Sequence, residues 1–252
     1  QKLASMIGRP NVSAEEIGTL IEKDQVLSAK VLRLANSPFY GFPSRIASVA
    51  HAVVVLGLNV VKGLTLCATA FDMMRNAGMN ELWRHSLGVA MTAHILGTKA
   101  AMKNPEEVFV AGLLHDIGKV VLYVKWPDVG QQITTVTRNT SRPLMDTEQE
   151  LFEVTHADVG GWLASAWHLP TSLREPILHH HTPAAAQDAK LQTAIVHVAD
   201  VLVKGLACGN PGDDLVPPLS RQAWDLVGLD AQSLAHCLTQ ATEEFQTIDD
   251  YL

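Results

Sequence analysis

The stretch 111–123 reads AGLLHDIGKVVLY, an apolar segment with a histidine and an aspartate side by side in its middle. Its apolar side chains recur at the three- and four-residue spacing of a helix face. They are Leu113, Leu114, Ile117, Val120 and Val121. The spacing predicts a helix, and burial of His115 and Asp116 in it costs free energy unless each finds a partner.

An adjacent histidine and aspartate can together hold one divalent metal ion, and a carboxylate can also bridge two. Lys119 lies three and four residues after the pair, so it shares their side of a helix, where it could meet an anion such as phosphate. The alternative is structural, with His115 hydrogen-bonded in the core and Asp116 at the surface. A single HD dipeptide favours that alternative, so the remaining sequence has to decide.

Helical spacing is typical of the first part of the chain. Ser13 followed by Glu16 forms a capping-box pattern, and the helix that it opens is expected to break near Asp24. A loop is expected at 36–45, where Asn36 and Ser37 cap or turn the chain ahead of Pro38, Gly41 and Pro43. The apolar segment 48–74 predicts two helices that separate at Gly57.

The later segments are helical as well. One helix is predicted over 81–102 and another from 108 through 124, ended by Pro127. Further helices are predicted over 146–167, 172–181 and 189–207. Residues 208–220 (CGNPGDDLVPPLS) form a long loop, expected as a boundary or a flexible crossing, and the tail holds one or two more helices. The fold class is therefore all-α.

Composition limits the classes of function. The 252 residues carry a formal net charge of −7, which disfavours direct nucleic-acid binding through a basic surface. The apolar runs are too short for a membrane span. Cys67, Cys208 and Cys237 are an odd number with no CxxC pair, which fits a reducing, cytoplasmic location. Since the chain begins with Gln1, we expect it to be part of a longer protein.

Histidine is the informative residue type. Seven of the 11 histidines fall between His115 and His197, and three of them stand together at 179–181. Asp200 lies in an apolar helix pattern, where a carboxylate needs a cation or hydrogen-bond donors. A series of such side chains on consecutive predicted helices favours a shared site over isolated structural roles. The series is His85, His115, Asp116, His156, His180, His181 and Asp200.

The order of these residues resembles the HD superfamily of metal-dependent phosphohydrolases, and the flanking text resembles its HDOD (HD-related output domain) branch. The resemblance extends from Ala14 to Leu206. It rests on VLRLANSPFYG, IASVAHAVVVLGL, LWRHS, GLLHDIGKVVL, HADVGGWLASAWHLP, HHTP and HVAD. It implies an HD-like helical bundle preceded by an amino-terminal helical subdomain. We expect the subdomain at 1–76, the metal-binding core at 77–206, and a loop with carboxy-terminal helices packing on the core at 207–252.

The resemblance also implies roles for single residues. His85, His115, Asp116 and Asp200 match the four residues that hold one metal ion in HD proteins. His156, His180 and His181 match the additional histidines of the HD-GYP phosphodiesterases, where a second metal shares the aspartate that corresponds to Asp116. Lys119 matches a lysine that contacts substrate phosphate. Asp116 and Lys119 are thus the catalytic candidates, and Glu81 could be a further ligand or an acceptor behind one.

Histidine and carboxylate ligands without a thiolate suit one or two divalent ions of iron, manganese, nickel, zinc or cobalt, with no choice among them. Adjacent helical residues point about 100° apart, so His179 is expected to face solvent or to support a ligand from behind. His197 could also support a ligand. The other histidines, namely His51, His94, His168 and His236, are interpreted as surface or packing residues. The tryptophans, among them Trp83, Trp162 and Trp167, are interpreted as core residues at helical spacing.

Two functions remain open. The LANSPFYG block and the absence of a GYP tripeptide after the histidine pair favour a signalling or regulatory HDOD module, which acts through a partner protein or an attached domain and could bind a nucleotide or phosphate. Many HDOD proteins have lost metal ligands, whereas this chain keeps every candidate position. The complete set, together with Lys119, favours the alternative, an active metal-dependent phosphohydrolase acting on a nucleotide or phosphodiester.

Overall fold

The computed structural model describes residues 14–37 and 44–246, and this part of the chain is helical, without strands. The predicted all-α class is confirmed. Its helices are α2 (Ala14–Glu22), α3 (Gln25–Ala35), α4 (Val49–Leu56), α5 (Leu58–Asn76), α6 (Asn80–Lys99), α7 (Pro105–Leu114), α8 (Ile117–Lys125), α9 (Pro127–Thr140), α10 (Leu144–Phe152), α11 (His156–Ala166), α12 (Thr171–His179), η2 (Pro183–Ala185), α13 (Lys190–Gly205), α14 (Arg221–Val227) and α15 (Ala231–Phe245). Within the described ranges, no helix combines the length and apolar character that a membrane crossing requires.

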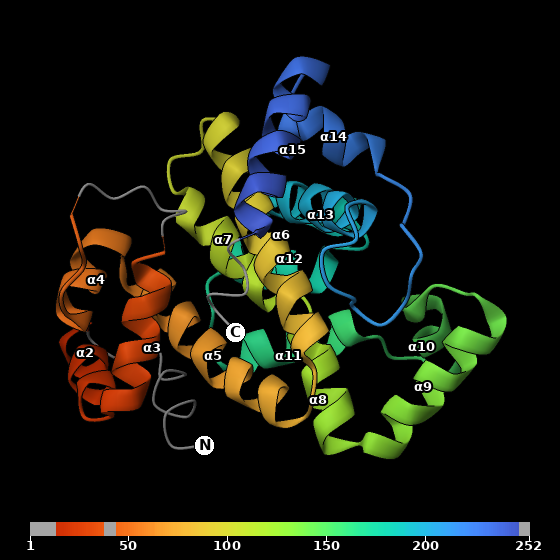
Figure 1. Ribbon diagram of the computed structural model, residues 1–252, viewed down its shortest axis with the longest axis horizontal. Coiled ribbons are helices and arrows are strands. Elements are labelled where there is room, and N and C mark those ends of the chain that lie inside the picture. Colours follow the sequence, from red (N-terminus) through yellow and green to blue (C-terminus); the bar gives the residue numbers. More distant parts are fainter. Residues whose placement is uncertain (1–13, 38–43, 247–252) are drawn as a thin grey trace.

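Helix α6 forms the centre of the fold (Figure 1). Its side chains from Ser86 to Gly97 are all buried, as expected for a helix surrounded by others. It packs against α7, α13 and α15. At the crossing with α7 the backbones come very close, because a Cβ at Gly112 would lie 2.7 Å from the Cα of Ala90. This crossing brings the end of α7 beside His85.

Helices α2, α3 and α4 gather at one end of the molecule, and α5 joins them to α6, α7 and α8 (Figure 1). The predicted break near Asp24 is confirmed, since its side chain caps α3 by accepting hydrogen bonds from Val26 and Leu27 N–H. The predicted break at Gly57 is also confirmed. Asn36 turns the chain through hydrogen bonds to the backbone of Leu32 and Ile46.

Some expectations lie outside the described residues or stay predictions. Ser13 of the predicted capping box is outside the described ranges, as are Pro38, Gly41 and Pro43. The expected boundary at 76/77 falls at the end of α5, and the one at 206/207 falls directly after α13. That these points separate folding units stays a prediction.

The expectation of one continuous helix through 108–124 is wrong. The chain turns at His115 and Asp116, between α7 and α8. The His115 Nδ1 lies 2.7 Å from the carbonyl oxygen of Gly112, which in an uninterrupted helix would accept from the N–H of Asp116. The side chain of His115 thus occupies the Gly112 carbonyl, to which the backbone N–H of Asp116 would otherwise donate. Both His115 and Asp116 therefore leave the regular helix.

The expected helix over 146–167 is also two helices. Glu153 adopts a left-handed backbone conformation (φ 56°) and ends α10. Thr155 and Asp158 then form a reciprocal capping box that starts α11. As a result, His156 stands at the first position of α11 rather than in the middle of a longer helix.

Helix α9 was not predicted, because Pro127 was interpreted only as the end of the preceding helix. Proline also suits the first turn of a helix, where its missing N–H needs no partner, and here it opens α9. The long loop over 208–220 crosses from α13 to α14, and Asp213 anchors it. Its carboxylate accepts from Lys204 Nζ (2.6 Å) and from Leu144 N (2.8 Å), tying α13 to α10.

Gly118 sets the distance between α8 and α11. A Cβ there would overlap the carbonyl oxygen of His156 and lie 2.9 Å from the backbone nitrogen of Gly160. Both neighbours are backbone atoms, so they cannot rotate away. The glycine of the HDIGK stretch is therefore required because the two helices touch at this point.

We predict that Gly118→Ala lowers the free energy of unfolding by about 3 kcal/mol, the upper part of the range for overpacking, because two backbones must separate. Urea unfolding measures this. Gly205→Ala is the matched control: its Cβ would meet nothing within 4 Å, so it should leave stability unchanged or raise it slightly. Equal stability of the two variants would contradict the packing argument.

His94 offers a second test of the core. It is a packing residue, as interpreted, since it is buried on α6 with its ring edge-on to Phe109. Burial lowers the pKa of His94 to about 4 from an ordinary 6.5. Between pH 6.5 and pH 4, His94 is therefore protonated in the unfolded chain but neutral in the folded chain. The free energy of unfolding falls as the pH drops through this range.

In His94→Gln, which cannot titrate, we expect the loss of stability between pH 7 and pH 4 to be smaller by about 3 kcal/mol. The measurement is urea unfolding at a series of pH values. Other titrating groups act equally in both proteins, so the difference isolates His94. Identical pH profiles would show that His94 is protonated in the folded core.

Candidate metal centre

All seven residues proposed as metal ligands lie in one cluster, although they come from five parts of the fold. His85 extends from α6, and His115 and Asp116 form the turn between α7 and α8. His156 begins α11, His180 and His181 follow α12, and Asp200 lies on α13. All are buried except His181, which is half-buried.

Asp116 lies at the middle of the cluster, and its two carboxylate oxygens face different histidines. Oδ2 lies 3.3 Å from His115 Nε2 and 4.0 Å from His85 Nε2. Oδ1 lies 3.3 Å from His156 Nε2 and 3.7 Å from His180 Nε2. This is the arrangement in which one carboxylate can join two cation sites.

Each side of Asp116 is completed by a further residue. On the Oδ2 side, Asp200 Oδ1 lies 3.0 Å from His85 Nε2 and 3.9 Å from His115 Nε2. On the Oδ1 side, His181 Nε2 lies 3.0 Å from His156 Nε2. The ligand atoms of His85, His115 and Asp116 lie within 4.8 Å of one another, and so do those of His156, His180 and His181.

The hydrogen bonds of three histidines fix which ring nitrogen faces the cluster. The Nδ1 of His115 meets the Gly112 carbonyl at 2.7 Å, and the Nδ1 of His180 meets the Ile177 carbonyl at 2.9 Å. A carbonyl oxygen can only accept, so these Nδ1 atoms carry the hydrogen. His156 Nδ1 likewise donates to the Glu148 carboxylate at 2.6 Å. In the neutral ring, each Nε2 is left with a lone pair directed at the cluster.

Lone pairs facing lone pairs indicate a cation between them. His180 Nε2 and Asp116 Oδ1 lie 3.7 Å apart, and neither has a hydrogen-bond partner among the described residues. Two buried acceptors in this position repel unless a proton or a metal ion joins them. Burial and the neighbouring His181 hold the pKa of His180 well below its usual range, so a proton is disfavoured there. The residues therefore fit a divalent metal ion.

The protonation states of the cluster residues also favour a bound metal ion. Burial alone would raise the pKa of Asp116, but His115 and Lys119 outweigh it and hold that pKa well below its usual range. Asp200 is likewise kept ionised, because hydrogen bonding by His85 outweighs the effect of burial on its pKa. Burial lowers the pKa of His181 to about 3. At neutral pH Asp116, Asp200 and His181, like His180, are in the protonation state that binds metal.

Two supporting residues complete the cluster from behind. Glu148 on α10 is fully buried and accepts hydrogen bonds from both the N–H and the Nδ1–H of His156. His197 donates from Nδ1 to the carbonyl of His180 at 2.7 Å, and its Nε2 accepts from Ser220 N–H at 3.0 Å. The sequence allows such a role for His197 but does not single out Glu148, because Glu148 resembles the other acidic residues of its helix.

Two other candidates lie outside the cluster. His179 is half-buried at the end of α12 and is not among the groups that could hold a metal. Glu81 is exposed and is not among the groups that could hold a metal. It lies instead on the wall of a cavity next to the cluster.

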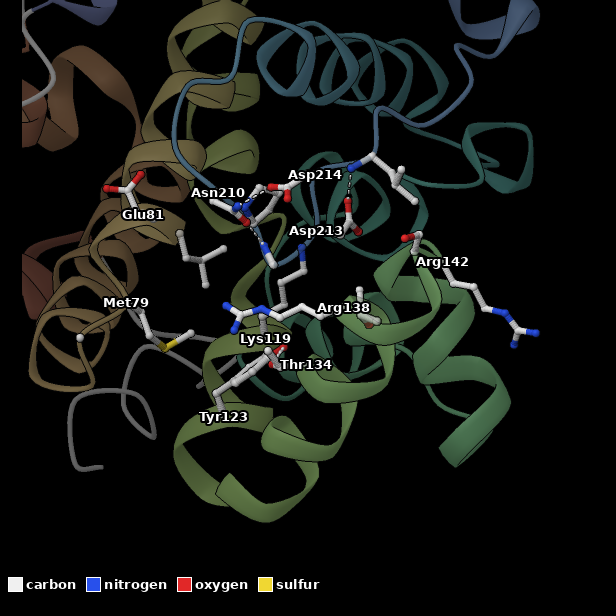
Figure 2. Close-up of a pocket in the computed structure, with 17 residues that line it drawn as sticks. Met79, Glu81, Lys119, Tyr123, Thr134, Arg138, Arg142, Asn210, Asp213 and Asp214 are labelled. Atoms are coloured by element: carbon white, nitrogen blue, oxygen red, sulfur yellow. Dashed lines mark hydrogen bonds between the residues drawn. The ribbon is translucent and has the colours of Figure 1, made fainter.

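This cavity has a volume of about 600 Å³ and lies between the start of α6, helices α8 and α9, and the loop over 208–220 (Figure 2). Among the described residues of the cluster and its lysine, only Lys119 lines the cavity. Its Nζ donates to Asp116 Oδ2 at 2.7 Å. Lys119 therefore connects the buried cluster with a space large enough for a small organic ligand.

We predict that Glu148→Gln weakens metal binding by the His156 side of the cluster about tenfold to hundredfold, as removal of a carboxylate behind a histidine ligand commonly does. Competition with a chelator of known affinity measures this. Glu150→Gln is the matched control, since Glu150 lies on the same helix, is exposed and pairs with Arg142. Unchanged affinity in Glu148→Gln would exclude a role for this contact.

Comparison with solved structures supports the fold. An HDOD domain protein of unknown function from Geobacter sulfurreducens has a TM-score of 0.74 and 28% identity, over 100% of this chain and 90% of that one. A protein of Shewanella amazonensis SB2B named "Putative phosphohydrolase" has a TM-score of 0.68 and 22% identity, over 100% of this chain and 91% of that one. At the latter identity the similarity concerns the fold alone.

Sequence comparison gives the family. An uncharacterized protein of Treponema pallidum (strain Nichols) is 26% identical over 215 residues, which are 83% of this chain. The chain spans only 42% of the length of that curated relative. The family model of the HDOD domain matches residues 1–183, most of the chain. The chain therefore belongs to the HDOD domain family.

Proposed function

We propose that this HDOD domain binds one or two divalent metal ions between the seven clustered side chains and hydrolyses a phosphoester. The observation that carries the proposal is the pairing of a buried cluster of histidines and aspartates with a cavity that reaches it at Lys119. A purely structural histidine cluster would need no such cavity. Among the described residues, none from helices α2, α3 and α4 lines the cavity.

The residues of the chain have distinct tasks in this proposal. Asp116 would share its two oxygens between the two halves of the cluster. His85, His115 and Asp200 would hold one ion, and His156, His180 and His181 a second. Glu148 would keep His156 in the tautomer that binds. A bound divalent ion supplies Lewis-acid polarisation of a phosphoryl oxygen and lowers the pKa of water.

Lys119 would guide the phosphoryl group. Burial opposes its charge, but the carboxylate of Asp116 outweighs burial and raises the pKa of Lys119, so the ammonium group stays charged. An anion that enters the cavity meets this ammonium group before it reaches Asp116. Lys119 can therefore exchange part of its contact with Asp116 for a phosphoryl oxygen and hold that oxygen beside the cluster.

A second function, a regulatory HDOD module that binds metal without turnover, is supported by the amino-terminal helices. Val54 on α4 is 83% exposed and Val26 on α3 is 65% exposed, both on helices that contribute nothing to the cluster. Exposed apolar side chains are common at protein contacts. In this candidate function, binding of metal and phosphate would alter the surface of α2–α5 that a partner protein or an attached domain contacts.

We predict that the purified chain hydrolyses bis(p-nitrophenyl) phosphate or a member of a nucleotide panel when loaded with Mn²⁺ or Fe²⁺. Asp116→Asn should lose both the bound metal and the turnover, because both halves of the cluster use this carboxylate. Metal analysis and release of p-nitrophenol or phosphate measure the two effects, and thermal unfolding checks that the variant is folded.

The two functions give different results. Metal at full occupancy without turnover of any panel member contradicts the phosphohydrolase and supports the regulatory module. A folded chain that holds no metal after anaerobic purification contradicts both. Turnover that persists in Asp116→Asn would show that the activity does not arise at this cluster.

A further inference from the structure

The carboxylate of Glu175 on α12 binds three consecutive backbone N–H groups that follow the histidine pair in sequence. It accepts from Gln187 N–H at 3.1 Å, from Asp188 N–H at 3.1 Å and from Ala189 N–H at 2.7 Å. Glu175 is only 7% exposed. Burial alone would raise its pKa, but the three donors outweigh burial and lower the pKa of Glu175 below its ordinary value. The carboxylate is therefore charged at neutral pH, and hydrogen bonds to a charged acceptor are strong.

The three N–H groups belong to the segment that joins two parts of the metal cluster. Residues 180–189 connect the end of α12 with α13, which carries Asp200. Ala189 stands directly before α13, and an alanine side chain cannot cap a helix. The positive end of the α13 dipole also favours a carboxylate at this point. Glu175 thus closes the chain between α12 and α13 into a loop that contains the histidine pair.

His181 depends on this loop more than the other histidines of its half of the cluster do. His156 is held from behind by Glu148, and His180 is held through its Nδ1 by the carbonyl of Ile177. In the described part of the chain, the His181 ring has hydrogen-bond distance only to His156, through the two Nε2 atoms on the ligand side. No acceptor behind the ring fixes it, so the position of His181 follows its backbone.

The backbone that carries this ring is a series of tight turns with few anchors. Thr182 N–H donates to the carbonyl of His179 at 2.9 Å, and the next hydrogen bonds along the chain are equally local. Local bonds fix the shape of a turn but not its place against other helices. Its place is set on one side by His197, which donates to the carbonyl of His180, and on the other side by the three hydrogen bonds of Glu175.

We infer that Glu175 is a positioning residue of the metal centre. By holding residues 187–189 it places His181 against His156, and it thereby sets how tightly that half of the cluster binds a divalent ion. Glu175 is not itself among the groups that could hold a metal, so its effect passes through His181. The inference rests on the proposed function because it requires metal at the cluster, but it does not require turnover.

Titration of the metal-stripped chain with Co²⁺, followed by the visible absorption of the bound ion, tests this role. Cobalt suits histidine and carboxylate ligands, and its spectrum reports the coordination of each bound ion. Glu175→Gln keeps the size of the side chain but removes its charge. We expect one cobalt ion to bind about tenfold more weakly, as after loss of a supporting carboxylate, with a changed spectrum. Any other bound ion should keep its wild-type affinity.

A double-mutant cycle with His181→Ala separates positioning from a general loss of stability. His181→Ala removes the ligand itself and should weaken the same cobalt ion. Adding Glu175→Gln to His181→Ala should weaken that ion no further, although it should still lower the melting temperature. Additive losses of affinity in the double variant would overturn the inference, and so would wild-type cobalt binding by Glu175→Gln.

Thr193→Val is the matched control. The buried Thr193 hydroxyl donates to the carbonyl of Ala189 at 2.9 Å, so this variant alters the start of α13 without removing a hydrogen bond of Glu175. It should bind cobalt as the wild type does. Weaker binding by Thr193→Val would show that any disturbance of this helix start affects the ion, and the assignment to Glu175 would fail.

The outcomes also separate this inference from the proposed function. If the cycle behaves as expected but no phosphoester is hydrolysed, the hydrolase fails and the positioning role of Glu175 stands. If a phosphoester is hydrolysed but the cycle is additive, the positioning role fails and the hydrolase stands. A folded wild type that binds no cobalt contradicts both.

Discussion

The carboxylate of Asp116 lies within 4.0 Å of four histidine rings and within hydrogen-bond distance of Lys119, all of them buried. Such a carboxylate is stable only if positive charge surrounds it. The helices that carry these side chains are consequently constrained to one arrangement. The turn between α7 and α8, the start of α11 at His156 and the end of α12 at His180 all place a side chain against this group.

The same constraint explains features that are otherwise unrelated. His115 takes the carbonyl of Gly112 and thereby breaks the helix, which turns both His115 and Asp116 toward the cluster. Gly118 lets α8 approach the backbone of His156. Asp213 ties α10, with Glu148, to α13, with Asp200. Packing, backbone turns and hydrogen bonds thus all act on the position of a few ligand atoms.

Much of this could be predicted from the sequence, because the informative residues are chemically distinctive. The all-α class followed from apolar spacing, and the order of histidines and aspartates indicated which side chains meet. The helix breaks at His115 and Glu153 could not be predicted from apolar spacing, since that spacing continues through both. The capping box of Thr155 and Asp158 was nevertheless readable, and it was missed. Glu148 became recognisable only once the fold brought it to His156.

The residues around the cavity illustrate the other limit of the sequence. Arg138 and Arg142 lie four residues apart and look equivalent, yet one extends across the cavity and the other pairs with Glu150. Glu81 was considered as a metal ligand because it is one helical turn from His85, but its side chain is exposed and does not join the ligand cluster. In both cases the direction of a side chain, which depends on neighbouring helices, decides its chemistry.

The most direct test of the central claim is anomalous X-ray diffraction from crystals of the chain purified with its own metal, recorded on both sides of the absorption edge of that metal. The account predicts one or two anomalous peaks at coordination distance from the carboxylate oxygens of Asp116, between His115 and His156. A metal peak elsewhere in the molecule, or none at Asp116 in protein that contains stoichiometric metal, would contradict it.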